Sequence, residues 1–371
     1  TQNATIGCMI VGIIMVALLT IVPHTEGSVL SALQQVDRFL PMAIMIGVTY
    51  QIRRSGRTSS INLPVVVAFA CCFFWGLVGF SKEGMLTPFF CWVIAASCLR
   101  YRLSTPQVIG IILTGIFIFQ YLVPYSQYGR NFRTGTLSGD IDVSISLLSN
   151  LGGVRRDFKA VEDDANDEQR SFYNTPQGFF DRLQMIWMDD HLIAYTEQRG
   201  TLGLYPIVAD FENLVPHFLW AKKPSINFGN FYAREVGDIL SENDDTTGIS
   251  FSSTAEAFHL AGWFGIFFVA PILWIMLFTL FDSLCGDVRK SPWGLVVIAY
   301  FAHMAPEGGL SGVIYTLGYV TVGIIFVAVT AAYVTPIVGT LIAGPEAISV
   351  RRTGQRIRSI PARVPNRIKE L

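Results

Sequence analysis

The sequence contains few charges and no cysteine arrangement that would indicate a disulfide framework or a zinc site. Charged residues make up 15% of the 371 positions. The six cysteines include no CxxC pair and no Cys/His spacing of the kind that binds metals. Because Cys8, Cys71, Cys72, Cys91 and Cys98 lie within apolar runs, we expect neither a structural disulfide nor a metal site.

Signatures of soluble nucleotide-binding and hydrolytic enzymes are missing as well. There is no GxxxxGK[ST] phosphate loop, no GxGxxG after a strand, no GxSxG elbow and no HExxH pair. The lone DxD in "GDIDV" (139 to 143) is a pattern that often occurs by chance. The net charge of −1 gives no indication of a nucleic-acid partner, and we expect no cofactor.

Long apolar runs dominate the chain. Hydrophobic residues make up 51% of it, and several runs approach the roughly 20 residues that a helix needs to cross a bilayer. We expect an all-α polytopic membrane protein with about eight transmembrane helices. Their predicted positions are 5 to 23, 38 to 52, 62 to 80, 85 to 99, 106 to 124, 256 to 282, 292 to 306 and 315 to 342. The second, fourth and seventh runs are short for a full crossing, which leaves tilted or re-entrant helices open.

The short connections between these runs are basic, which predicts an orientation. They are "QIRRSGR" (51 to 57), "LRYRLS" (99 to 104), "DVRK" (287 to 290) and the tail from Arg351. Basic connections face the cytoplasm, and a single alternation of crossings satisfies all of them. Both termini of this chain are then cytoplasmic. Residues 125 to 255 lie on the other side, and there acidic residues outnumber basic ones by 19 to 11.

These considerations divide the chain into four parts. Residues 1 to 124 carry five transmembrane helices, 125 to 255 form a large extracytoplasmic loop, 256 to 345 carry three more helices, and 346 to 371 form a basic cytoplasmic tail. The first run has no charged leader and no small-residue cleavage site, so we do not interpret it as a signal peptide. Since the sequence opens on Thr1, further spans before it are left open.

The large loop is too long for an ordinary connection, so we expect it to carry function. Its segment "RRDFKAVEDDANDEQR" (155 to 170) is highly charged and favours a solvated, mobile strip. Residues 177 to 200 place Phe179, Leu183, Ile186 and Ile193 at helical spacing, which predicts an amphipathic helix on the outer membrane face or over the bundle. From 201 to 229 we expect an ordered loop with short helical turns.

Ionisable residues at the outer ends of spans are the candidates for function, because a charge at that depth costs free energy. In "GFSKEGML" (79 to 86), Lys82 is placed where a lipid headgroup would lie, and the alternative is a snorkelling lysine paired with Glu83. His303 and Glu307 lie four residues apart near the outer end of the seventh run. A pore or packing role suits this last pair as well as catalysis does.

A second candidate pair leads back into the membrane. In "SFSSTAEAFHLAGWFG" (250 to 265), Glu256 and His259 lie three residues apart and therefore on one helical face. The alternative for Glu256 is helix capping, because Ser253 and Glu256 match the S-x-x-E capping box.

Two stretches resemble a known family. "VPHFLWAKKPSINFGNFYAREVG" and, after a polar gap, "SFSSTAEAFHLAGWFGIFFVAP" resemble the bacterial oligosaccharide repeat-unit polymerases, the O-antigen polymerase (Wzy-type) and ligase superfamily. That family shows a proline-aromatic-Lys-Pro stretch ending its large periplasmic loop, then a Glu before a small-residue helix with a Gly-aromatic-x-Gly step. "GFSKEGML" is similar to the family's external Ser-Arg/Lys-x-Gly turn, with Lys82 at the cationic position.

The resemblance implies a membrane glycosyltransferase of the bacterial inner membrane. It would polymerise undecaprenyl-pyrophosphate-linked oligosaccharide repeat units into O-antigen or exopolysaccharide at the periplasmic face. A chain-length regulator and a flippase are further partners that it implies. Two alternatives stay open within membrane glycan assembly: an O-antigen ligase, which transfers glycan to a lipid acceptor, and a lipid-linked oligosaccharide flippase. A non-enzymatic assembly protein is also open.

Residue types in these stretches suit that chemistry. Displacing a pyrophosphate from an anomeric carbon requires stabilisation of the leaving group's negative charge, for which Lys82, Arg182 and Lys223 are the candidates. An incoming hydroxyl needs a base, which Glu256 or His259 would supply. The remaining predicted substrate-binding residues are Trp220, His303 and Glu307. For Trp220, interfacial anchoring is the alternative to stacking on a sugar.

Overall fold

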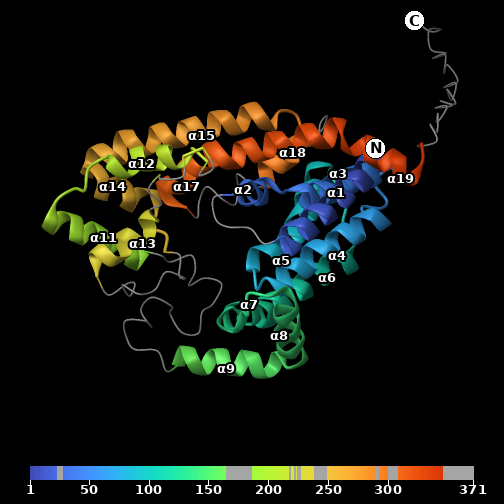
Figure 1. Ribbon diagram of the computed structural model, residues 1–371, viewed down its shortest axis with the longest axis horizontal. Helices are drawn as coiled ribbons and strands as arrows, with labels where there is room; N and C mark the ends of the chain where they lie inside the picture. The colour runs from blue at the N-terminus through green and yellow to red at the C-terminus, as the bar shows by residue number, and fades with distance from the viewer. Residues whose placement is uncertain are drawn as a thin grey trace, which may run out of the picture.

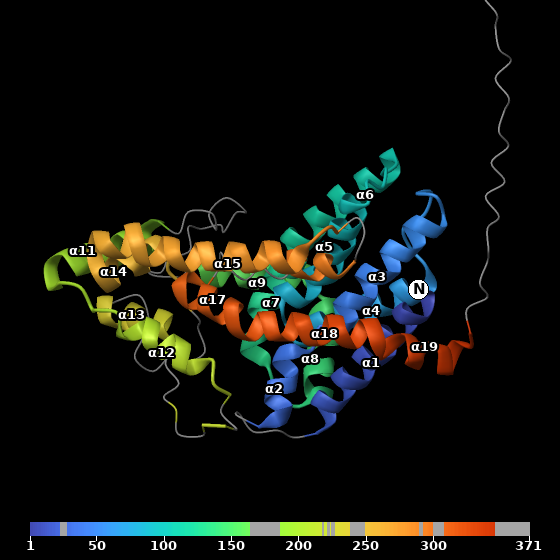
Figure 2. The same cartoon turned by 90° about the horizontal axis from the view of Figure 1, so that it is seen from above.

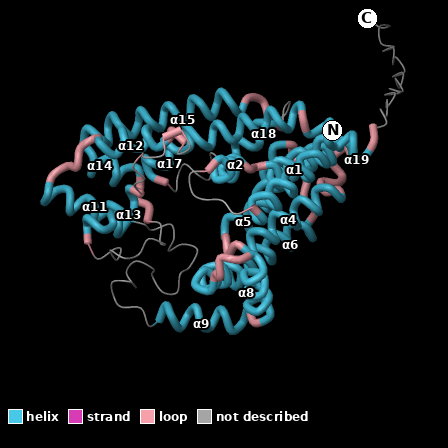
Figure 3. Tube along the Cα trace, in the orientation of Figure 1, coloured by secondary structure: helices cyan, strands magenta, loops and turns pink. Residues whose placement is uncertain are grey.

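The computed structural model describes residues 1 to 22, 28 to 163, 186 to 216, 219 to 220, 223, 227 to 237, 249 to 288, 292 to 299 and 308 to 345. Every regular element in these ranges is a helix, as Figure 3 shows. The predicted all-α class is therefore confirmed.

Most helices of the first part of the chain lie together on the right of Figure 1, whereas its second helix lies nearer the centre and contacts the last long helix. The elements of this first part are α1 (Gln2–Ile21), α2 (Val29–Val36), α3 (Phe39–Arg54), α4 (Leu63–Val78), α5 (Lys82–Cys98) and α6 (Thr105–Phe117). A π-helical turn (Ile118–Leu122) continues α6 into α7 (Val123–Gly129), and a 3-10 turn (Arg130–Phe132) ends that helix. Below it in Figure 1 lie α8 (Leu137–Ser149) and α9 (Leu151–Asp163).

The second part supplies short helices and then the last long ones. The short helices are α11 (Ile186–Arg199), α12 (Tyr205–Asn213) and α13 (Phe228–Val236). They precede α14 (Ser253–Phe264), which leads through a π-helical turn (Gly265–Val269) into α15 (Ala270–Cys285). Then α17 (Gly309–Tyr315), a π-helical turn (Thr316–Val320), α18 (Thr321–Tyr333) and α19 (Thr335–Ala343) follow. In both Figure 1 and Figure 2, α15 and α18 run side by side.

Four helices are long and apolar enough to cross a bilayer. They are Gln2–Ile21, Thr105–Phe132, Ser253–Cys285 and Gly309–Tyr333, and α4 is a shorter apolar helix. Large apolar side chains point outward from them, such as Ile112 on α6, Phe278 on α15 and Val322 on α18. An exposed apolar surface of this extent suits contact with lipid rather than water. The total of eight crossings stays a prediction.

The first and last helices are held together by glycine and hydroxyl contacts. At Gly7 of α1, a Cβ would lie 1.8 Å from the carbonyl oxygen of Thr335, and at Gly339 of α19 it would lie 1.9 Å from that of Asn3. The Cys8 thiol donates to Thr335 Oγ1 at 3.4 Å, within the same contact. Small residues that permit close backbone approach, with polar side chains between them, are typical of helix pairs in membranes.

The helix positions differ from the predicted ones in several places. The apolar helix that begins at Thr105 continues to Phe132, further than the predicted end of the fifth span at 124. The charged strip predicted to be mobile begins as helix α9, because Leu151, Val154 and Phe158 recur at helical spacing and Val154 is buried. The helix α2 was not predicted. Of the amphipathic helix predicted for 177 to 200, α11 covers the second half, and 177 to 185 lie outside the described residues.

Candidate functional site

The helix that carries Glu256 and His259 is broken just after them. Ala261 and Gly262 have non-helical backbone angles, and Gly262 has φ 59° and ψ −142°, a conformation that essentially only glycine adopts. The carbonyl oxygens of His259 and Leu260 accept hydrogen bonds from the backbone N–H groups of Leu202 and Gly203, each at 2.9 Å. The break therefore separates a short helical segment, with both candidate residues, from the long helix that follows.

Glu256 is buried and joins α14 to the start of α17. Its side chain is 3% exposed, and Oε2 accepts from the backbone N–H of Leu310 at 2.6 Å. A Cβ at Gly309 would lie 2.4 Å from Glu256 Oε1, so only glycine leaves room for this carboxyl group. The capping interpretation is wrong in its details, because Ser252 rather than Ser253 caps α14, by accepting from Ala255 N–H at 3.1 Å.

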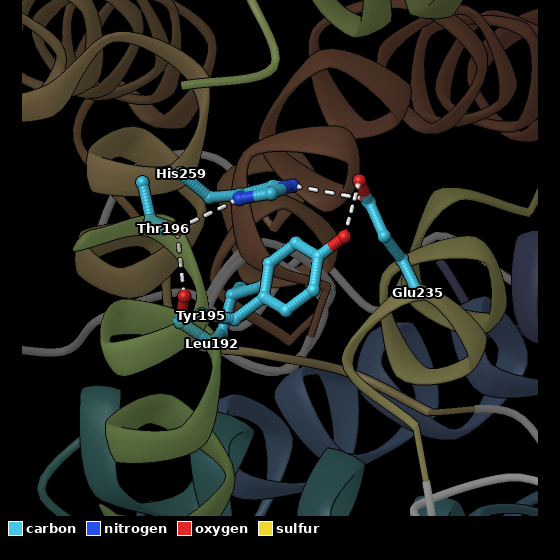
Figure 4. A network of polar contacts seen from close by, with 5 residues as sticks. All are labelled: Leu192, Tyr195, Thr196, Glu235 and His259. Atoms are coloured by element: carbon cyan, nitrogen blue, oxygen red, sulfur yellow. Dashed lines mark hydrogen bonds and ion pairs between the residues drawn. The ribbon is translucent and has the colours of Figure 1, made fainter. Parts of the chain in front are cut away.

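His259 lies at the centre of a polar network formed by three helices (Figure 4). Its Nδ1 is 2.8 Å from Oγ1 of Thr196, on α11, and its Nε2 is 3.3 Å from Oε2 of Glu235, on α13. The Tyr195 hydroxyl, also on α11, donates to the other oxygen of Glu235 at 3.4 Å. The ring edge of Tyr232 packs against the imidazole, with centroids 5.0 Å apart. The carboxylate of Glu235 is thus held from two sides.

A hydrogen bond joins His259 to Glu235. His259 Nε2 and Glu235 Oε2 are 3.3 Å apart, so the contact between them requires a proton on one of the two atoms. On the other side of the ring, Nδ1 lies 2.8 Å from the Thr196 hydroxyl, which also contacts the carbonyl oxygen of Leu192 at 2.6 Å. The pair can therefore hold and exchange a proton.

The two members of this pair differ in access to solvent. The His259 side chain is 1% exposed, whereas that of Glu235 is 24% exposed. A molecule arriving from outside can therefore touch Glu235 but not His259. Burial, the charge of Glu235 and the hydrogen bond to it raise the pKa of Tyr195, which keeps its hydroxyl protonated as a donor.

Further carboxylates lie close to the network. Burial and the charges of Glu256, Asp210 and Glu235 raise the pKa of Tyr232, so three carboxylates act on this one hydroxyl. Asp210 Oδ2 accepts from the Ser311 hydroxyl at 2.6 Å, and burial raises its pKa to about 6 against the opposing effect of this hydrogen bond. Within the described ranges, no three His, Cys, Asp or Glu side chains are arranged to hold a metal ion.

The structure places Lys223, Trp220 and Lys82 outside this network. The Lys223 ammonium group is buried and donates to the carbonyl oxygens of Asn213 and Val215, at 2.6 and 2.5 Å. Trp220 is exposed in the turn before it. Lys82 begins α5, at a turn that packs against α7 through Phe80. Lys223 thus has a structural role, while Lys82 belongs to a different group of helices.

Three predicted site residues cannot be placed. Arg182, His303 and Glu307 lie outside the described residues.

The sequence interpretation missed Glu235, Thr196 and Asp210. A signal existed for Thr196, because it continues the buried stripe formed by Met188 and Leu192, and a hydroxyl on such a stripe needs a partner. Glu235 lies within the family-like stretch, where the lysines and aromatics drew attention instead. Asp210 is recognisable only once α12 is known to pack on α17.

Comparison with known proteins adds no relative to this description. No family model, curated protein or solved structure matches the chain.

Proposed function

We propose that the chain is a membrane glycosyltransferase that polymerises undecaprenyl-pyrophosphate-linked oligosaccharide repeat units into O-antigen or exopolysaccharide. The reaction would take place at the periplasmic face of the bacterial inner membrane, on the side of residues 125 to 255. The observation that carries the proposal is the proton-holding pair of His259 and Glu235, with one partly exposed carboxylate beside the start of a long apolar helix. The motif resemblance supplies the substrate class.

Glu235 is the group that we propose to act on the acceptor. As the acceptor hydroxyl attacks the anomeric carbon of the donor, its proton passes to Glu235, and the bond between that carbon and the pyrophosphate oxygen breaks. His259 positions Glu235 through the contact between its Nε2 and Glu235 Oε2. This changes the predicted roles of Glu256 and His259, since both are too buried to touch a substrate.

The leaving group carries away negative charge, which cationic side chains can stabilise. We propose Lys82 and Arg182 for this part on the motif resemblance and their charge alone, since Lys82 lies outside the network and Arg182 outside the described residues. Arg130 donates to the carbonyl oxygen of Phe80 at 3.2 Å, which brings a further cation to the turn that precedes Lys82. Lys223 is left out, because its ammonium group is occupied with two backbone carbonyls.

An O-antigen ligase is the second candidate, because it uses the same donor and the same kind of base. It differs only in the acceptor, which would be a lipid-borne glycan rather than another repeat unit. A flippase is less favoured. Transporters concentrate polar groups near the middle of the bilayer between repeated halves, whereas the polar network here lies at one end of a broken helix.

Purified protein in liposomes with lipid-linked oligosaccharide tests these possibilities together. Polymerisation predicts a ladder of products that differ by one repeat unit, together with release of undecaprenyl pyrophosphate. A single transfer to an added lipid acceptor, with no ladder, would identify a ligase. Movement of the lipid-linked oligosaccharide across the bilayer without any new glycosidic bond would identify a flippase. The absence of all three activities would contradict the proposal.

A further inference from the structure

The helix α12 and the turn after it carry a long apolar stripe on their outer side. Leu204, Tyr205, Val208 and Phe211 recur at helical spacing along α12, and Val215, Leu219 and Trp220 follow after the helix ends. All seven side chains are between 37% and 70% exposed. An exposed apolar stripe of this length is unfavourable in water. Lipid or another protein surface must therefore contact this stripe.

The inner side of the same segment packs along the start of the last long helix. Asp210 accepts from Ser311, the side chain of Leu214 lies over Gly318, and the Tyr319 hydroxyl donates to the carbonyl oxygen of Asn213 at 3.3 Å. As α12 advances from Asp210 to Leu214, its contacts advance from Ser311 to Gly318. The two helices therefore run parallel and start from the same side. Eight residues of helix between Ser311 and Tyr319 correspond to about 12 Å along the helix axis.

Side chains of the protein donate hydrogen bonds to the backbone carbonyl oxygens at the end of α12. Lys223 donates to the carbonyl oxygens of Asn213 and Val215, and Tyr319 donates to that of Asn213 as well. Inside a bilayer, a chain can leave helical geometry only where its freed carbonyls find such partners within the protein. At the protein surface, water would donate to these carbonyl oxygens and a buried lysine would not be needed. The buried Lys223 therefore suits a position inside the membrane.

We propose that the segment from Leu204 to Pro216, which contains α12, is embedded in the membrane, with its apolar stripe facing lipid acyl chains. The segment enters the bilayer beside Gly309, from the same face. Lipid is the occupant that the structure favours, because the stripe lies beside a helix that itself spans a bilayer's thickness and exposes Val322 and Ile325 further along. The inference does not depend on the proposed function.

Spin labels on single introduced cysteines test this placement in liposomes. Val208→Cys, Phe211→Cys and Val215→Cys place the label on the stripe, at exposed positions where it disturbs no packing. Gln198→Cys on the exposed side of α11 is the aqueous control, and Ile275→Cys on α15 is the lipid control. The signal of the unsubstituted protein, with its six native cysteines, is subtracted.

The measured quantity is the ratio of collisions with oxygen, which concentrates in the bilayer, to collisions with a water-soluble nickel complex. We expect this ratio to be several-fold higher at 208, 211 and 215 than at 198, and close to that at 275. Ratios equal to that at 198 would place α12 in water and overturn the proposal. Low collision rates with both reagents would show a protein cover, and would also overturn it.

A second measurement uses the unsubstituted chain. Phospholipids with a photoreactive group on the acyl chain are added to the liposomes, and cross-linked peptides are identified by mass spectrometry. We expect adducts within 204 to 216 as well as on α15. Adducts on α15 with none in 204 to 216 would contradict a lipid-facing stripe.

Discussion

Glycines allow close contact between helices at several places, and two of these contacts fill the space differently. Between α1 and α19, Gly7 faces the backbone carbonyl of Thr335, and the polar groups nearby are a thiol and a hydroxyl. Between α14 and α17, Gly309 faces the carboxyl group of Glu256. The first contact is built from neutral groups, whereas the second admits an ionisable one.

The difference separates scaffold from candidate site. A neutral hydroxyl that bonds to a carbonyl holds two membrane helices at little cost. A carboxyl group in the same setting is costly, so its presence indicates a use. Around α14 such groups gather: Glu256, Glu235 and Asp210 all act on Tyr232, and His259 shares a proton with one of them. The α1–α19 contact should therefore determine stability alone, and the α14 end should determine activity as well.

The largest expected effect is on activity, at Glu235. Glu235→Gln keeps the size of the side chain and an oxygen for Tyr195, but it removes the proton acceptor. We expect turnover of lipid-linked oligosaccharide to fall by about 100-fold or more, on the scale of losing a positioned base. Membrane abundance and thermal stability in detergent should change little. Polymer length and abundance are measured together.

Glu197→Gln is the matched control, because Glu197 lies on the exposed side of α11 near the same network. It should leave turnover unchanged. If Glu235→Gln makes polymer of normal length at a normal rate, the pair has no role in proton transfer and the α14 end is scaffold like the other contact.

Helices could be predicted from the sequence more fully than the candidate site. The residues that define a helix boundary lie close together in the chain, whereas the residues that form the site lie far apart. Helices begin at local capping signals that can be recognised in the sequence. The helix α4 begins after Asn62, whose side chain accepts a hydrogen bond from Val65 N–H, and α5 begins after Ser81, whose side chain accepts one from Gly84 N–H. Such signals lie within a few residues of the boundary. Long apolar helices are therefore predictable from the sequence.

The partners of the two candidate residues lie much further away. Glu256 and His259 stand out because each interrupts an apolar run, but the bonds that define them reach 54 residues on to Leu310, 24 residues back to Glu235 and 63 residues back to Thr196. No local pattern specifies these pairings. They depend on how α11, α13 and α17 pack around α14, so the network could not be predicted from one sequence.

The next largest effect is expected at Gly309, where both stability and activity should suffer. Gly309→Ala places a Cβ 2.4 Å from Glu256 Oε1, at a residue whose φ of 57° already disfavours side chains. We expect a loss of about 2 kcal/mol or more, because overpacking and backbone strain add. Thermal unfolding in detergent measures it, with Gly110→Ala in α6 as the control, where a Cβ has open space. Equal stability of the two variants would contradict the close fit of Glu256.

A smaller effect, on stability alone, is expected at the other glycine contact. Gly7→Ala forces α1 away from the Thr335 carbonyl and should cost about 1 to 3 kcal/mol. Turnover per folded molecule should stay normal, since no ionisable group of the α14 end is involved. Thermal unfolding and a turnover assay normalised to folded protein measure the two quantities. A specific loss of turnover would show that the two contacts are coupled, and would break the distinction between scaffold and site.

The smallest effect is expected at Lys223, which tests whether a buried charge can belong to the scaffold. Lys223→Met keeps most of the apolar chain but removes the donor to the carbonyl oxygens of Asn213 and Val215. We expect a loss of about 1 to 2 kcal/mol, because the two carbonyls lose a partner while Tyr319 still donates to Asn213. Turnover per folded molecule should fall less than twofold, whereas Lys82→Ala should lower it more, if Lys82 stabilises the leaving group. A large and specific loss of turnover in Lys223→Met would return this residue to the substrate site, and would mean that its carbonyl contacts position a cation rather than support α12.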